Sequence, residues 1–107
     1  MIEIDPTKYK EDQRKGWNNV AIGWLKWWEI TENAGSNLSK RLIELAEIKQ
    51  GSIVLDISTG IGEPAITAAS KIGKNGHVLA VDISPQMLSV AKERAKSMDL
   101  QDLIEFR

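Results

Sequence analysis

An α/β fold with a parallel sheet is predicted by two features of this sequence. Short apolar runs at Ile53–Ile57, His77–Asp82 and Leu103–Phe106 are separated by two segments in which apolar residues recur at helical spacing. Parallel strands need a crossover between them, so this alternation indicates parallel strands joined by right-handed crossovers. The first run also ends at a tight glycine loop, Ser58–Gly62, after which a helix is expected to begin. Together these features predict the N-terminal half of a Rossmann-like doubly wound parallel sheet, with three strands, preceded by two helices.

Composition and charge are those of an ordinary globular domain. The 107 residues are 42% hydrophobic and 27% charged, which is not typical of a disordered chain. The formal net charge is −1 without a basic patch, so no nucleic-acid partner is expected. The absence of cysteine excludes disulfides and thiolate metal sites. No apolar run approaches the roughly 18–20 residues of a membrane span, and the first residues do not resemble a signal peptide, so we expect a cytoplasmic protein with no stable membrane insertion.

Two helices are expected before the first strand. Residues 1–15 are polar and predict irregular structure or a weakly held helix. The segment 16–29 places six apolar side chains on one helical face, namely Trp17, Val20, Ala21, Trp24, Trp27 and Trp28. A loop is expected at Thr31–Asn37, followed by a second helix over residues 38–49.

The helices that follow the first two strands carry terminal signals. Pro64 is expected at the first position of one helix, where a missing N–H costs nothing, and Gly73 at its end. Ser84 is expected to cap the other helix, with Pro85 in its first turn.

The boundaries of the sheet predict how the chain is organised. We assign residues 1–37 to an N-terminal extension with a tryptophan-rich helix, and residues 38–107 to the half-domain that contains the sheet. The strand order 3-2-1 places Ile53–Ile57, expected to be buried, beside the position of a fourth strand that this sequence lacks. We therefore expect the chain to be the N-terminal part of a longer protein. Alone, it is expected to form a homodimer through the exposed edge of that first strand.

The glycine loop predicts a nucleoside site of unusual charge. Asp56 and Glu63 flank it, and the segment has no lysine or arginine. Pro64 also removes one N–H donor from the start of the helix. A pyrophosphate would instead favour basic side chains and free N–H donors. Asp82 follows Gly62 by 20 residues, the separation at which nucleotide folds place an acid on the ribose diol. Alternatively, Asp82 ends a strand and helps to cap the next helix. This charge favours a ligand with an adenosine body and a positive centre. Asp56 would bind the ammonium group of such a ligand, or else cap the loop.

The charge and spacing of the glycine loop leave two other classes of function open. Gly60, Gly62 and Ala65 fit the G-x-G-x-x-A pattern of NAD- or FAD-binding modules, although the two carboxylates disfavour a dinucleotide. A non-catalytic assembly domain is the other alternative, with a vestigial loop and a tryptophan helix that mediates association.

Two motifs resemble those of a known family. Val54–Gly62, read Val-Leu-Asp-Ile-Ser-Thr-Gly-Ile-Gly, resembles the first motif of class I S-adenosylmethionine-dependent methyltransferases. Val81–Leu88 resembles their second motif, in the form common among ubiquinone/menaquinone C-methyltransferase-like members. The resemblance covers residues 17–107 and implies methyl transfer from S-adenosyl-L-methionine to an unidentified small-molecule acceptor.

The same resemblance implies roles for particular residues. Asp56, Ser58, Gly60 and Gly62 would line the methionine and ribose side of the cofactor, Asp82 would hold the ribose diol, and Ile83 and Met87 would flank adenine. Ser58 departs from the pattern, because it stands where the family usually has its first glycine and a positive φ is unfavourable for serine.

The tryptophan helix also resembles a family feature. Trp17, Ala21 and Trp24 match the spacing of an N-terminal segment that closes over the cofactor, with Trp24 in place of the usual tyrosine. We expect Trp17 and Trp24 to face the pocket as part of a lid. The alternatives are packing on the domain core, which is favoured for an aromatic stripe, and a membrane-surface helix, which the few flanking bases disfavour.

The remaining polar residues predict no catalytic group. His77 is expected at a solvated strand end, and Lys92, Arg94 and Lys96 on a solvated helix surface. No nucleophile–base pair or metal-ligand spacing is visible, so no catalytic residue and no metal are assigned. Methyl transfer needs mainly positioning of donor and acceptor. Residues that select the acceptor are expected beyond the third strand, so the chain alone is expected to be inactive or nearly so.

Overall fold

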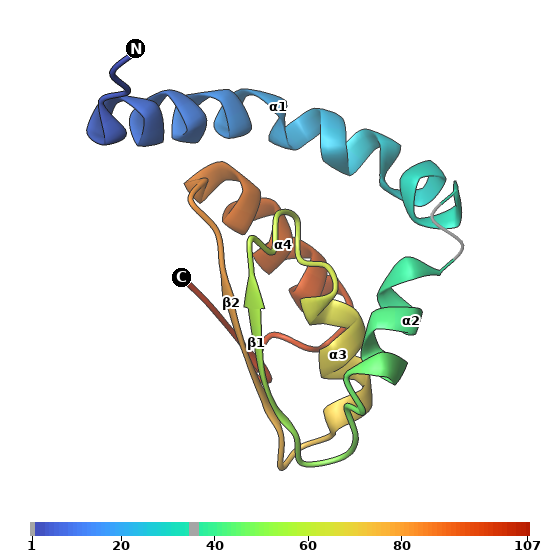
Figure 1. The fold of residues 1–107 in the computed structure, drawn as a ribbon. Helices are drawn as coiled ribbons and strands as arrows, with labels where there is room; N and C mark the ends of the chain where they lie inside the picture. The colour runs from blue at the N-terminus through green and yellow to red at the C-terminus, as the bar shows by residue number, and fades with distance from the viewer. Residues whose placement is uncertain (1, 35–36) are drawn as a thin grey trace.

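The computed structural model describes residues 2–34 and 37–107 as a small sheet with helices against one of its faces (Figure 1). In chain order the elements are α1 (Pro6–Ala34), α2 (Leu38–Leu45), β1 (Ile53–Ile57), α3 (Ala65–Ile72), β2 (His77–Val81), α4 (Pro85–Ser97) and β3 (Ile104–Phe106). Helices α3 and α4 connect the strands, and α2 packs against α3. Helix α1 lies along α4 at the carboxyl end of the strands, where it covers the end of the sheet (Figure 1).

The sheet confirms the predicted α/β topology. Its order is β1-β2-β3 and both pairs are parallel, with Val54 opposite Val78 and Val78 opposite Ile104. The carboxyl ends of β1 and β2 therefore meet at one edge, and the loop after each strand opens at that edge.

Small side chains let α3 lie close to this sheet. Ala65, Ala68 and Ala69 are fully buried, and Ile72 and Val78 fill the remaining space between helix and strands. Burying a side chain of the size of isoleucine or valine stabilises the fold by about 1.5–3 kcal/mol.

The opposite face of β1 is uncovered among the described residues, which corrects the expectation of a buried strand. Ile53, Leu55 and Ile57 are 77%, 59% and 69% exposed. Side chains alternate along a strand, so these three share one face, while Val54 and Asp56 point to the helices. The apolar run predicted burial on both faces, but α2, α3 and α4 cover only one.

Helix α1 is longer than predicted at both ends. It begins at Pro6 because the Asp5 carboxylate accepts hydrogen bonds from the backbone N–H groups of Thr7 (2.9 Å) and Lys8 (3.3 Å). At the other end the helix continues to Ala34 through most of the expected loop, and residues 35–36 of that loop lie outside the described residues. No helix in the described part of the chain, α1 included, combines the length and the apolar character needed to cross a bilayer.

Two shorter helices also differ from prediction in their bounds. Helix α2 ends at Leu45 rather than residue 49, and Glu47 then takes a positive φ of 54°. Pro64 occupies the cap position of α3 rather than its first turn, whereas Gly73 ends that helix as predicted. The prediction for α4 is confirmed, since the Ser84 hydroxyl accepts a hydrogen bond from the Met87 N–H (3.1 Å).

Candidate functional site

The loop after β1 folds back over the carboxyl end of β2. The Thr59 N–H donates to the Val81 carbonyl (2.9 Å), which fastens the loop to the neighbouring strand. Ser58 takes a φ of 61° and Gly60 a φ of 57°. The backbone at Ser58 is therefore left-handed, as the family's usual glycine would permit, and here a serine accepts that conformation.

Gly62 serves packing rather than the wall of the site. Its φ is 106°, and a Cβ built on it would lie 2.7 Å from the Ile66 Cδ1 and 3.3 Å from the Ala91 Cβ. A side chain at this position would separate α3 from α4.

Asp56 lies under the loop. Its Oδ2 accepts hydrogen bonds from the Thr59 hydroxyl (2.7 Å) and from the Ala65 N–H at the start of α3 (3.0 Å). Burial raises the pKa of the Asp56 carboxyl above its ordinary value, although both hydrogen bonds oppose the shift. The carboxylate thus ties the loop to the helix that follows it.

Asp82 joins the ends of the two strands. Its Oδ2 accepts from the Gly60 N–H (2.8 Å) and its Oδ1 accepts from the Ser84 N–H (2.9 Å). Each carboxylate oxygen can take a second hydrogen bond. The residue that ends β2 therefore both orders the glycine loop and retains acceptor capacity.

A cavity of about 380 Å³ lies between this loop, the start of α4 and the inner side of α1. It contains most of the residues predicted for the cofactor, but Asp56 and Gly62 are not among those that line it. Its lining comprises Trp17, Trp24, Trp28, Ser58, Thr59, Gly60, Ile61, Glu63, Asp82, Ile83 and Met87. Trp28, Thr59 and Ile61 were not assigned to the site from sequence, although Trp28 follows Trp24 by one helical turn.

Helix α1 is fixed to the N-terminus of α4. The Asn18 Oδ1 accepts hydrogen bonds from the Ser84 hydroxyl (2.5 Å) and the Gln86 N–H (3.3 Å). Ala21 is buried against Ile61 and Met87 one turn further along. These contacts hold the tryptophan-bearing part of α1 over the cavity.

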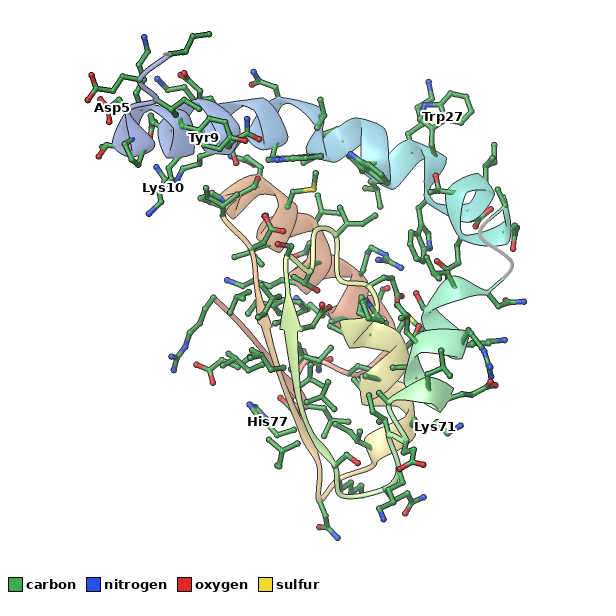
Figure 2. The ribbon with its side chains drawn as sticks, viewed as in Figure 1. Asp5, Tyr9, Lys10, Trp27, Lys71 and His77 are labelled. Atoms are coloured by element: carbon green, nitrogen blue, oxygen red, sulfur yellow. The ribbon has the colours of Figure 1, made fainter. Side chains whose placement is uncertain are left out.

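The four tryptophans of α1 have different environments. Trp17 and Trp24 line the cavity and are each 42% exposed. Trp28 also lines the cavity, but it is half-buried against Ile61 and its neighbours. The alternative of packing on the domain core therefore applies to this residue. Trp27 is 55% exposed and points away from the rest of the domain (Figure 2).

Arg94 corrects a prediction. It was expected on a solvated surface, but its side chain is only 14% exposed. One guanidinium nitrogen donates to the Ile61 carbonyl (2.6 Å), another pairs with Glu63 (3.4 Å), and the group lies 4.0 Å from the Trp28 ring centroid. Burial lowers the pKa of Arg94, opposed by the charge of Glu63. The physical reason for the error is that α1 and the loop both close on this part of α4.

The electrostatics of the cavity follow from these contacts. Asp82 and Glu63 line it, and no described lysine or arginine does. The Glu63 carboxylate is already paired, since it accepts a hydrogen bond from the Thr67 hydroxyl (2.7 Å) and forms an ion pair with Arg94 (3.4 Å). Within residues 2–34 and 37–107, no group of three histidine, cysteine or acidic side chains is arranged for a metal ion. His77 is half-exposed at the start of β2, the end away from the cavity (Figure 2).

Fold and site together define a class of protein, a Rossmann-like domain with a small-molecule cavity at the carboxyl ends of its parallel strands. A family model described as a methyltransferase domain matches residues 48–107, and the chain belongs to this family. The predicted fold class and the resemblance to class I methyltransferases are thereby confirmed.

Individual relatives are also methyltransferases. The chain is 39% identical over 62 residues to arsenite methyltransferase of Halobacterium salinarum, covering 58% of this chain and 16% of that protein. It is 36% identical over 64 residues to demethylmenaquinone methyltransferase of Listeria welshimeri, covering 60% and 27%. An RNA methyltransferase from Salinibacter ruber, solved in complex with S-adenosyl-L-homocysteine, superposes with a TM-score of 0.61 at 30% identity over 65% of this chain and 44% of that one. The chain thus spans less than half the length of each of these proteins.

Proposed function

We propose that this chain is the cofactor-binding part of an S-adenosylmethionine-dependent methyltransferase that acts on a small-molecule acceptor. The observation that carries the proposal is the largely apolar cavity at the end of the sheet, which Asp82 and Glu63 line and which has no lysine or arginine among its described lining residues. Such a wall suits a ribose diol and a positively charged donor, and it disfavours a diphosphate. The volume of about 380 Å³ lies within the range of about 300–1,000 Å³ of small-molecule sites.

The nucleoside would be held at the end of β2. Asp82 accepts hydrogen bonds from the ribose diol with the lone pairs that Gly60 and Ser84 leave free. Ile83 and Met87 offer apolar contact to adenine, since both line the cavity next to Asp82.

The methionine part would lie at the glycine loop. Ser58 and Gly60 bring backbone groups to it, and Trp24 closes the outer side of the cavity as part of a lid formed by α1. Asp56 and Gly62 act from outside the lining: Asp56 ties the loop to α3, and Gly62 permits close packing of α3 and α4. When bound, S-adenosylmethionine supplies a methyl group that its sulfonium already activates, so these residues need mainly to bind and orient.

Titration calorimetry tests this assignment against a dinucleotide. S-adenosylhomocysteine is expected to bind the 107-residue chain with one site, whereas NAD at the same concentration produces no binding heat. Saturable binding of NAD without binding of S-adenosylhomocysteine would refute the proposal.

The acceptor is proposed to be a small molecule rather than a nucleic acid. The net charge of −1, with acidic and basic residues interspersed, offers little of the attraction that phosphate backbones require. A mobility shift with structured RNA at low salt tests this point, and no shift is expected.

Self-association and location complete the proposal. Two copies associate through the uncovered face and edge of β1, because Ile53, Leu55 and Ile57 together expose apolar surface beside unpaired strand groups. A cytoplasmic location also belongs to the proposal, and fractionation of cells that express the tagged chain tests it.

A further inference from the structure

We propose that Trp24 distinguishes the charged methyl donor from its neutral product, so that the cavity binds S-adenosylmethionine more tightly than S-adenosylhomocysteine. This inference rests on the proposed function and adds a specificity-determining residue to it.

Aromatic side chains line one side of the cavity. Trp17, Trp24 and Trp28 line it from α1, and Glu63 lines it from the loop. An indole ring attracts a cation through its negative face, more strongly than phenylalanine does. Because Glu63 is already paired with Arg94, the attraction for a positively charged ligand comes from the indoles, with no lysine or arginine among the described lining residues to oppose it.

The position of Trp24 follows from two fixed points of α1. Asn18 is bonded to Ser84, which follows the proposed nucleoside site at the end of β2. Trp28 lies on Arg94, whose guanidinium is bonded to Ile61 in the glycine loop. Trp24 lies on the helix between these points, one turn before Trp28. Along α1 it therefore lies between the nucleoside side and the loop side of the cavity that it lines.

The other two indoles are placed less well for this role. The ring of Trp28 is already engaged by the guanidinium of Arg94, 4.0 Å from its centroid. Trp17 precedes Asn18 and belongs to the nucleoside end. Trp24 is partly exposed and lines the cavity, so its ring remains accessible to a ligand.

Charge discrimination has a simple consequence for turnover. Loss of the methyl group converts the sulfonium to a neutral thioether, and the attraction to the indole face is then lost. A product that binds more weakly than the donor leaves the site more readily.

The test compares affinities for the two ligands by calorimetry on the whole chain. Trp24→Leu is expected to lower the ratio of the S-adenosylmethionine affinity to the S-adenosylhomocysteine affinity by about 3- to 30-fold, the range that a cation–π contact implies. Trp24→Phe keeps an aromatic face and is expected to retain part of the ratio. Trp27→Leu is the matched control, since Trp27 points away from the cavity, and it is expected to leave the ratio unchanged (Figure 2).

The possible outcomes separate this inference from the proposed function. If both ligands bind but Trp24→Leu and Trp24→Phe keep the wild-type ratio, Trp24 does not sense the charge. The same conclusion follows if Trp27→Leu lowers the ratio as much as Trp24→Leu does. Equal affinities of the wild-type chain for the two ligands would refute the proposed preference for the donor. If the wild-type chain binds neither ligand, the proposed function itself fails.

Discussion

The Asp82 carboxylate accepts a hydrogen bond from the backbone N–H of Gly60 at 2.8 Å, across the gap between the ends of two neighbouring strands. The acid at the end of β2 therefore shapes the loop at the end of β1. Asp82→Asn places an amide where both carboxylate oxygens now accept N–H groups, so one hydrogen bond is lost and the proposed ribose site is expected to weaken. Charge-assisted hydrogen bonds contribute about 1.5–3 kcal/mol, and the affinity for S-adenosylhomocysteine is expected to fall about 10- to 100-fold.

Calorimetry on Asp82→Asn measures that loss, with Asp102→Asn at an exposed turn as the matched control. An Asp82→Asn chain that binds as tightly as the wild type would show that this acid has no part in the site.

Substitution of Gly62 tests the packing of α3 on α4. Gly62→Ala introduces a Cβ 2.7 Å from the Ile66 Cδ1 at a φ of 106°, and we expect a loss of about 1–3 kcal/mol in the free energy of unfolding by urea. Gly16→Ala is the control, because no atom lies within 4 Å of its Cβ and alanine favours helix, so it is expected to be neutral or stabilising. Adding Ile66→Val to Gly62→Ala should recover part of the loss. Equal stability of the two alanine variants would contradict this account.

Arg94 is expected to hold the loop and α1 together. Arg94→Ala leaves Glu63, whose side chain is 13% exposed, without its ion pair and removes the stack on Trp28. We expect the free energy of unfolding to decrease by about 2–3 kcal/mol, and the tryptophan emission to shift to longer wavelength. Lys92→Ala, an exposed change on the same helix, should alter neither measurement. A stability change no larger than that of Lys92→Ala would show that the contacts of Arg94 do not stabilise the fold.

Asp56 predicts a pH dependence of stability with a definite sign. Burial raises its pKa above the ordinary 3.8, so the folded chain binds the proton more tightly than the unfolded chain. Ionisation of Asp56 therefore costs stability as pH rises from about 3.8 through the raised pKa. Asp56→Asn cannot ionise, and its amide oxygen can still accept from Thr59 and Ala65. The stability of the wild type minus that of Asp56→Asn is expected to fall across this window.

Urea unfolding between pH 4 and 7 measures this difference, in which the other titrating groups cancel. Asp56→Ala, which leaves the Thr59 hydroxyl and the Ala65 N–H unpartnered, is expected to be about 1–3 kcal/mol less stable than Asp56→Asn. A difference that grows with pH would mean that hydrogen bonding outweighs burial at this carboxyl.

The uncovered face of β1 predicts a variant with altered association. Leu55→Lys places a charge in the middle of the apolar row and is expected to shift the sedimentation equilibrium toward monomer. Gln101→Lys, at an exposed turn, adds the same charge elsewhere and should leave the equilibrium unchanged. A wild-type chain that is monomeric at micromolar concentration would contradict the proposed self-association.

Local signals predicted much of the fold. The bounds of β1 are those expected, because a short apolar run ends directly at a glycine loop. The start of α4 was predictable from Ser84 and Pro85, whose effects on a helix terminus depend on neighbouring residues alone. The hydrogen bond between Gly60 and Asp82 was not predicted, although the parallel topology explains it because it brings the ends of β1 and β2 to one edge.

Features that depend on distant segments were not predictable in the same way. Arg94 is charged and lies among other charged residues, and only the crossing of α1 explains its burial. Asp56 lies under the loop because Thr59 and Ala65 donate hydrogen bonds to it. The motif alone does not decide between this role and the binding of an ammonium group. The exposure of Ile53 and Leu55 depends on which face the helices cover.

The two walls of the cavity are held in different ways. The loop after β1 is hydrogen-bonded to β2 through Thr59 and Gly60 and belongs to the sheet, whereas α1 is anchored mainly at Asn18, Ala21 and Trp28. Sub-global opening of α1 can therefore occur while the strands stay folded, and its amide protons should exchange with solvent sooner than those of β2. Substitutions on the inner side of α1 are therefore expected to change the outer wall of the cavity with little cost to the folding of the sheet.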